Sequence, residues 1–374
     1  MPPKEQEVNT AGGNFLKLFF SLNVLLIFIP FSLYLEYFRP QAHTLIFFSA
    51  CLGIIPLAGW MGKATEQIAD RAGEGIGGLL NATFGNAAEL IIAIVALRAG
   101  YLDIVKASLT GSIIGNILLV LGASFLAGGL RYKIQEYNVI SARAQAQMLL
   151  LTSVAIITPA LFHFLRPTEI VVNEAAISLA LAGLLIVVYV FSLIFSLHTH
   201  KDLFRGAPQE EAGEKKEVAA WSLPVALAVL GIATFFIAWL SEILVGSVEQ
   251  AALHLGMSKV FVGIIIVAVI GNAAEHSTAV MAAMKNRMDL SVGIAIGSST
   301  QVALFLTPLL VFLSYLLAPQ QMDLVFTRGE VFAIVISASL VAHTTSDGKS
   351  NWFTGLLLLT VYLVMAVAFF HVPG

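Results

Sequence analysis

Charged residues are scarce in this chain: only 11% of its 374 residues are Asp, Glu, Lys or Arg, whereas 58% are hydrophobic. A soluble domain usually carries about 25% charged residues, so most of this protein's surface must face something other than water. The lipid bilayer is the obvious candidate, because a spanning helix needs about 20 mostly apolar residues. The composition therefore predicts a protein embedded in a membrane.

Cysteine is nearly absent as well. The single residue, Cys51, excludes an internal disulfide and a cysteine-based zinc or iron–sulfur site. The formal charge of −3 lacks the strong basic excess of nucleic-acid-binding proteins, so no nucleic-acid partner is expected. A signal peptide is not indicated, because the first apolar run, residues 15–38, is too long and is followed by Arg39 and Pro40 without a small-residue cleavage site.

Apolar runs predict an all-α polytopic membrane fold with eleven transmembrane helices. They cover residues 15–38, 45–61, 76–99, 104–130, 144–165, 175–197, 221–245, 260–284, 290–317, 324–342 and 352–372. The tenth run is the weakest, because Arg328 and Glu330 lie near its start. The only long hydrophilic segment inside the chain, residues 198–217, is interpreted either as a solvated linker or as an acidic patch that gathers cations.

The distribution of Lys and Arg predicts the orientation. If the N-terminus lies in the cytoplasm, most of the 20 basic residues fall on the cytoplasmic side and the C-terminus lies outside. The short N-terminal tail, with no long regulatory extension, favours the cell membrane of a prokaryote.

An internal repeat divides the chain. The pentapeptide from Gly85 to Glu89 recurs 186 residues later, from Gly271 to Glu275, and the same offset relates Asp103 to Asp289. Residues 41–199 and 220–374 are therefore predicted to be two five-helix repeats, joined by an acidic cytoplasmic linker at 200–219 and preceded by a tail and an extra span at 1–40. Because five is odd, the second repeat enters the membrane from the opposite side, which gives an inverted repeat.

Two carboxylates occupy equivalent positions in these repeats. Glu89 and Glu275 are each predicted near the middle of a span, where an ionisable residue costs at least about 2.5–3.5 kcal/mol and so marks a functional site. The two-fold relation should bring the pair face to face. Two buried carboxylates repel each other, so a cation must lie between them or one must be protonated. Exchange of a divalent cation for protons follows naturally from this arrangement.

Polar and small residues accompany both glutamates. Gly85 and Gly271 predict breaks in the helices, which would free carbonyl oxygens, and the amides of Asn86 and Asn272 add further oxygens. The following spans present Ser112 with Asn116, and Ser298 with Gln301, each pair on one helix face. Close helix packing and ordinary interhelical hydrogen bonds are the alternative explanation of these residues.

The chemistry of these groups limits the ion. All are hard oxygen donors, which favours Ca²⁺, Mg²⁺, Mn²⁺, Na⁺ or H⁺ over soft metals. His276 follows Glu275 and points about 100° away from it on a helix. Its side chain is expected either to pack or to tune the carboxylates and relay protons.

The stretches from Gly77 to Leu97 and from Gly271 to Met281 resemble the paired repeat motifs of the Ca²⁺/H⁺ antiporter family, in the Ca²⁺/cation antiporter superfamily. The resemblance covers essentially the whole chain. It implies a secondary transporter that exports cytoplasmic Ca²⁺ in exchange for H⁺ by alternating access, with no cofactor. It also implies that Glu89 and Glu275 bind the cation, assisted by the carbonyls of Gly85 and Gly271.

Other functions are weighed against this one. The related Na⁺/Ca²⁺ exchangers typically carry Ser/Thr-rich motifs and an extra acid where this chain has Gln301 and Val302, which favours protons over Na⁺ here. A channel would conduct without proton coupling. An intramembrane hydrolase using Ser277 and His276 is disfavoured, because adjacent residues point apart on a helix; no enzymatic activity is expected. The selectivity among Ca²⁺, Mn²⁺ and Mg²⁺ and a homo-oligomeric state stay open.

Overall fold

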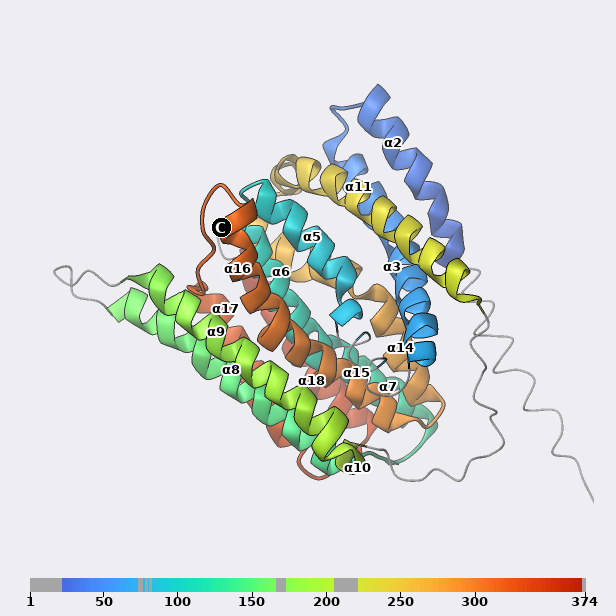
Figure 1. Ribbon diagram of the computed structural model, residues 1–374, viewed down its shortest axis with the longest axis vertical. Helices are drawn as coiled ribbons and strands as arrows, with labels where there is room; N and C mark the ends of the chain where they lie inside the picture. The colour runs from blue at the N-terminus through green and yellow to red at the C-terminus, as the bar shows by residue number, and fades with distance from the viewer. Residues whose placement is uncertain are drawn as a thin grey trace, which may run out of the picture.

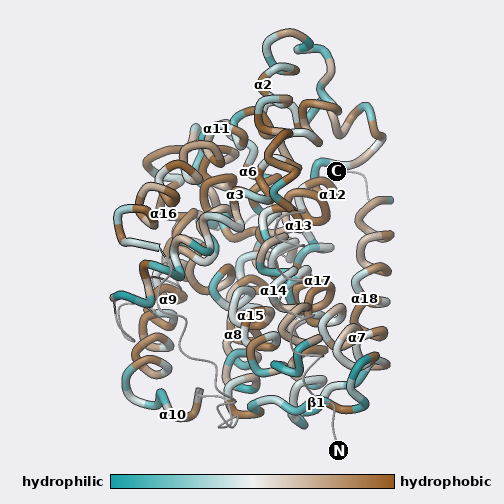
Figure 2. Tube along the Cα trace, turned by 90° about the vertical axis from the view of Figure 1, so that its right-hand side faces the viewer, coloured by the Kyte–Doolittle hydropathy of each residue, from teal (hydrophilic) through white to brown (hydrophobic). Residues whose placement is uncertain are grey.

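The computed structural model describes residues 22–72, 77, 80, 83–165, 173–204 and 221–371. Regular structure in these residues is helical apart from one short antiparallel pairing, of β1 (Gln135–Glu136) with β2 (Lys349–Ser350). The helices lie side by side in a bundle (Figure 1). Hydrophobic residues dominate most of them, and hydrophilic residues gather near α10 and β1 (Figure 2).

The helices of the first half begin after the undescribed N-terminal residues. They are η1 (Val24–Ile27), α2 (Phe28–Phe38), α3 (His43–Ala72), α5 (Ala87–Arg98), α6 (Leu102–Ile114), η2 (Gly115–Val120), α7 (Leu121–Arg131), α8 (Val139–Leu165), α9 (Glu174–Ile194), η3 (Phe195–Thr199) and α10 (Lys201–Phe204). The segment η2 is π-helical and joins α6 to α7 without a break.

The remaining helices belong to the second half. Its helices are α11 (Leu223–Leu255), α12 (Lys259–Phe261), η4 (Val262–Val267), α13 (Ala268–Gly271), α14 (Ala273–Met284), α15 (Met288–Gln301), η5 (Val302–Leu306), α16 (Thr307–Leu317), α17 (Arg328–Thr344) and α18 (Trp352–His371). Three helices of this half, α14, α15 and α16, begin 186 residues after α5, α6 and α7.

Seven of the described helices are long and apolar enough to cross a membrane, or eight if the bent pair formed by residues 259–271 and 273–284 is one span. The expected number of eleven is not confirmed, and it stays a prediction. Part of the first and third expected spans lies outside the described residues, and α17, at 17 residues, is short for a crossing.

Two helices extend well beyond the expected apolar runs. The second and seventh apolar runs end at residues 61 and 245, but α3 and α11 continue to Ala72 and Leu255. The added turns contain strong helix formers such as Glu, Gln and Ala, so the helix persists although the apolar run has ended. The two helices pack along each other for much of their length.

One of the charged residues that weakened the tenth run, Glu330, has a structural role at the start of α17. Thr327 and Glu330 form a capping box: the Glu330 backbone N–H donates to Thr327 Oγ1, and the Thr327 backbone N–H donates to Glu330 Oε2 at 2.9 Å. This arrangement satisfies backbone groups that a helix leaves free at its N-terminus. The helix therefore begins at Arg328, four residues later than the apolar run.

Backbone conformation repeats with the same 186-residue offset. Gly100 and Asn286 both have positive φ, of 82° and 60°, in the turns that precede α6 and α15. Asn is one of the few non-glycine residues that adopts this region readily. The next residues, Tyr101 and Arg287, share a ψ of 61°. The two halves therefore share local structure as well as sequence around the two motifs.

Small residues bring the two halves into close contact. A Cβ atom added to Gly111 would lie 2.1 Å from the carbonyl oxygen of Ile264, and one added to Gly263 would lie 2.6 Å from the Ala107 Cβ. No side chain larger than hydrogen fits at either position, so α6 and η4 pack with their backbones almost in contact. This crossing holds the two sequence motifs near each other.

Candidate cation site

Glu89 and Glu275 lie in the first turns of α5 and α14, directly after breaks in their spans. The first break covers Gly85 and Asn86 and the second falls at Asn272; the two asparagines have φ of −98° and −96°. In the second half the chain bends there by 62°. A helix N-terminus carries partial positive charge, so each short helix stabilises the ionised form of its own glutamate.

The Glu89 side chain reaches across to the break of the other half. It is buried, and a Cβ built on Gly271 would lie 3.1 Å from Glu89 Cγ and 3.8 Å from its carboxyl carbon. Glu89 also lies near enough to Glu275 for the two carboxylates to repel each other. The missing side chain at Gly271 therefore makes room for Glu89 and allows the two acids to share one region.

Reciprocal hydrogen bonds connect the two halves around this region. Ser298 Oγ donates to Asn86 Oδ1 at 2.9 Å, and Asn272 Nδ2 donates to Ser112 Oγ at 3.0 Å. At the 186-residue offset Asn272 is the counterpart of Asn86, and Ser298 is the counterpart of Ser112. Each pair therefore joins the asparagine of one half to the serine of the other. Each asparagine at a break is thus held by a serine of the other half, which lies on α6 or α15, and all four residues are buried.

Further side chains hydrogen-bond to the pair of Asn86 and Ser298, whereas Asn272 in the other pair donates a second bond to the Ala268 carbonyl at 2.9 Å. Asn86 Nδ2 donates to Gln301 Oε1 at 2.8 Å, and Asn116 Nδ2 donates to Ser298 Oγ at 3.1 Å. His276 Nε2 lies 3.1 Å from Asn116 Oδ1. The offset places Gly115, Val302 and Leu90 at the positions equivalent to Gln301, Asn116 and His276, and none of these three has a polar side chain. The site therefore consists of a symmetric part and a polar extension on one side.

Three buried oxygens in the site, Glu89 Oε1, Glu275 Oε2 and Asn272 Oδ1, accept no hydrogen bond from any residue that the structure describes. An unsatisfied buried acceptor costs roughly 1–3 kcal/mol, and more when it is charged. Protons could satisfy the carboxylates, whereas a hard cation could satisfy all three oxygens. Within the described ranges no group of three His, Cys, Asp or Glu side chains could hold a metal. A cation here would therefore need amide, carbonyl or water oxygens beside the two carboxylates.

Five of the residues selected from the sequence are joined in one hydrogen-bonded network, and two more form a separate pair; the five are Asn86, Asn116, Ser298, Gln301 and His276, and the pair is Asn272 with Ser112. The break expected at Gly85 agrees with the structure, because Gly85 and Asn86 form the turn before α5, whereas α13 includes Gly271 and the second interruption falls one residue later than expected, at Asn272. In the first half Asn86 is likewise the N-cap of α5. Gly85 precedes this cap, and none of the side-chain hydrogen bonds described above involves it. His276 points to Asn116, which agrees with an orientation away from Glu275.

Sequence reasoning assigned no role to Glu330. This carboxylate is 2% exposed and accepts a hydrogen bond of 3.4 Å from Thr110 Oγ1, in addition to its capping contacts. The spacing Thr327-Arg-Gly-Glu330 is the sequence signature of a capping box, and it could have identified the start of α17.

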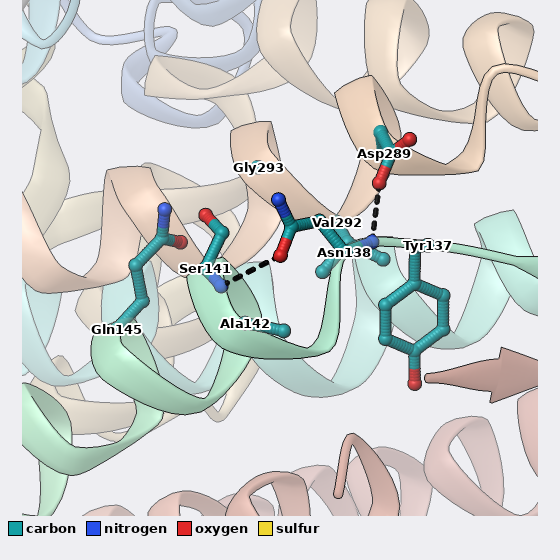
Figure 3. A pocket seen from close by; sticks show the side chains of 8 residues that line it. All are labelled: Tyr137, Asn138, Ser141, Ala142, Gln145, Asp289, Val292 and Gly293. Atoms are coloured by element: carbon teal, nitrogen blue, oxygen red, sulfur yellow. Dashed lines mark hydrogen bonds between the residues drawn. The ribbon is translucent and has the colours of Figure 1, made fainter. Parts of the chain in front are cut away.

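A small polar pocket of about 40 Å³ lies apart from the glutamates, between the start of α8 and α15 (Figure 3). Asp289 accepts a hydrogen bond of 2.5 Å from the backbone N–H of Asn138, and Asn138 Oδ1 accepts one of 3.1 Å from the Ser141 N–H. Tyr137 lines the same pocket. Burial, with a smaller contribution from Asp347, raises the pKa of its phenol, so the side chain is neutral. These bonds anchor the chain ahead of α8, and none of these residues belongs to the glutamate network.

Comparisons with known proteins agree with this architecture. The family model described as "Sodium/calcium exchanger protein" matches residues 42–198 and 225–371. A protein named Ca(2+)/H(+) antiporter from Aphanothece halophytica is 44% identical over 362 residues, which cover 93% of this chain and 96% of that protein. The Ca(2+)/H(+) antiporter ChaA of Bacillus subtilis is 46% identical over 323 residues, covering 86% and 90%.

A solved structure is similar over nearly the full length. The structure of native YfkE superimposes with a TM-score of 0.80 at 39% sequence identity, covering 95% of this chain and all of that one. The helical packing described above is therefore shared with an experimentally determined protein.

Proposed function

The chain belongs to the sodium/calcium exchanger protein family, and we propose that it is a secondary transporter that exports cytoplasmic Ca²⁺ in exchange for H⁺. The relatives named Ca(2+)/H(+) antiporter support this assignment, because they are 44–46% identical over most of the chain. The transport cycle requires no covalent chemistry and no cofactor. Ca²⁺ and protons are its substrates.

The observation that carries the proposal is the pair of buried carboxylates with unsatisfied oxygens. Glu89 and Glu275 come from equivalent positions in the two halves, and each has one oxygen that no described residue satisfies. One Ca²⁺ between them neutralises both charges, and protons on the carboxylates do the same when Ca²⁺ leaves. Binding of either substrate therefore excludes the other, which is the requirement for exchange.

The remaining residues complete and position this site. Ca²⁺ takes six to eight oxygen ligands, so two carboxylates are not enough. Asn272 Oδ1 and the backbone carbonyls of Gly85 and Gly271 supply further oxygens, together with water. The hydrogen-bonded residues hold the ligands in place; they are Asn86, Ser112, Asn116, Ser298 and Gln301. His276 adjusts proton binding through its contact with Asn116.

Alternating access follows from the inverted repeat that the sequence predicts. Contacts between helices support that layout: α7 packs against α18 as α16 packs against α9, and α5 packs against α11 as α14 packs against α3. Two similar halves related in this way can exchange conformations and so open the site first to one side and then to the other. The predicted frame is an extra first span and two five-helix repeats, with the N-terminus in the cytoplasm of a prokaryotic cell and the C-terminus outside.

Uptake of ⁴⁵Ca²⁺ into proteoliposomes tests the proposal. An imposed pH gradient, with no Na⁺ on either side, should drive uptake, and a proton ionophore should abolish it. Uptake that requires a Na⁺ gradient would instead identify a Na⁺/Ca²⁺ exchanger on the same fold. Competition by Mn²⁺ or Mg²⁺ in the same assay would define the selectivity.

A further inference from the structure

A large cavity lies beside the cation site and takes no part in the function proposed above. Its volume is about 670 Å³, and it lies between α8, the end of α9 with η3, and α15. Its walls are mostly apolar and include Met148, Leu151 and Val188. Pockets of about 300–1,000 Å³ with apolar walls and a few polar groups are typical of sites for organic ligands.

The cavity has a lateral position in the bundle. Phe191, Ile194 and Phe195 belong to its lining and are 65%, 45% and 40% exposed. Exposed apolar side chains on membrane-spanning helices face the hydrocarbon chains of the bilayer. The molecules with most ready access to the cavity are therefore lipids.

Charge distinguishes one end of the cavity. Its lining ends at Thr199, and His198, His200 and Lys201 beside it are all exposed. Basic residues at a membrane surface attract anionic lipid headgroups, by about 1 kcal/mol for each Lys or Arg. We propose that the cavity is a binding site for one acyl chain of an anionic phospholipid, with the headgroup at Lys201.

The inner end of this site touches the cation network. Gln301 and Thr300 line the cavity, and Gln301 accepts the hydrogen bond from Asn86 at the break before α5. A chain that fills the cavity keeps bulk water away from this bond. Gln145 lines both this cavity and the polar pocket of Figure 3, so it lies between the proposed lipid site and a pocket with polar walls.

Photochemical crosslinking of the full-length protein in nanodiscs tests the proposal directly. The probe is a phosphatidylglycerol that carries a diazirine near the end of one acyl chain, and mass spectrometry locates the modified residues. We expect crosslinks at Met148 and Val188. Ser192→Trp, which fills the cavity, should lower their yield about tenfold, corresponding to roughly two excluded methylene groups. Val190→Trp is the matched control, because Val190 is exposed on α9 but does not line the cavity.

Two more variants test whether the cavity holds something other than an anionic lipid, namely a neutral lipid or water. Lys201→Gln should weaken retention of phosphatidylglycerol relative to phosphatidylcholine. Ser196→Cys, made with the buried Cys51 replaced by Ala, reports what fills the cavity. Rapid reaction of this cysteine with a charged, membrane-impermeant thiol reagent would mean water rather than lipid. Crosslinks between two copies of the chain, or equal crosslink yields for the Ser192 and Val190 variants, would also overturn the proposal.

Discussion

Gly271 provides the sharpest test of how the two halves share the site. Substitution by Ala introduces a Cβ that would lie 3.1 Å from Glu89 Cγ, whereas non-bonded carbon atoms prefer about 3.5–4.0 Å. The Glu89 side chain must therefore move by roughly half an ångström. Ca²⁺–oxygen distances span only about 2.3–2.6 Å, so a shift of this size displaces the carboxylate from its best position. We expect the apparent affinity for Ca²⁺ to fall about tenfold, which is about 1.4 kcal/mol.

Folding should not suffer in the same variant. Gly271 has an ordinary backbone conformation at the end of α13, and replacing Gly by Ala inside a helix gains roughly 0.5–1 kcal/mol. Gly183→Ala is the matched control, because a Cβ at that position in α9 meets no atom within 4 Å. Calorimetric Ca²⁺ titration and thermal unfolding, measured on both variants, separate affinity from stability. Wild-type affinity in a well-folded Gly271→Ala protein would refute the shared-site geometry.

Four further outcomes are expected. Glu89→Gln and Glu275→Gln should each lower the rate of pH-driven ⁴⁵Ca²⁺ uptake by at least about 100-fold while the protein stays folded, because each change removes one of the two negative charges that balance Ca²⁺. Near-normal uptake by either variant would show that its glutamate is not part of the site. In the proposed site Ca²⁺ binds the ionised carboxylates, so its affinity should weaken as the pH falls and its binding should release protons. Calorimetry in buffers of different ionisation enthalpy counts the released protons, and a count of zero between about pH 6 and 8 would require a separate proton path. His276→Ala should shift the pH at which Ca²⁺ binding is half-maximal if the imidazole acts through Asn116. An unchanged pH would mean that His276 only packs against its neighbours. Deletion of residues 209–217, which lie outside the described residues, should alter the dependence of transport on Ca²⁺ concentration without ending transport. An unchanged dependence would mean that this segment is only a linker.

The paired motifs could be recognised from the sequence for two reasons, the cost of a carboxylate inside an apolar run and the recurrence of the same motif in the second half. A carboxylate in an apolar run is costly, and its recurrence after 186 residues in the same five-residue context requires a common cause. The backbone follows this offset in detail, as the positive φ values of Gly100 and Asn286 show. Sequence reasoning placed the first break correctly at Gly85 but the second one residue early, because Gly271 is compatible with a helix end as well as with a break.

Features that depend on packing were beyond the sequence. The length of α3 and α11 exceeds the apolar runs because helix propensity and mutual packing continue where hydropathy declines. The pairing of Asn86 with Ser298, and of Asn272 with Ser112, needs the relative placement of the two halves. The cavity beside α9 is a gap between helices, and no count of apolar residues indicates where side chains leave space.

The division of the site into symmetric and asymmetric parts bears on the proposed transport cycle. A carrier that exchanges substrates needs two access states of similar free energy, since a large difference would trap it in one of them. The symmetric part, with the two glutamates and the reciprocal Asn–Ser pairs, contributes almost equally to both states if the halves exchange conformations. Gln301, Asn116 and His276 have apolar or absent counterparts at the equivalent positions, so their hydrogen bonds can differ between the two states. Any preference of the empty carrier for one side of the membrane should therefore originate in these three residues rather than in the two carboxylates proposed to bind the cation.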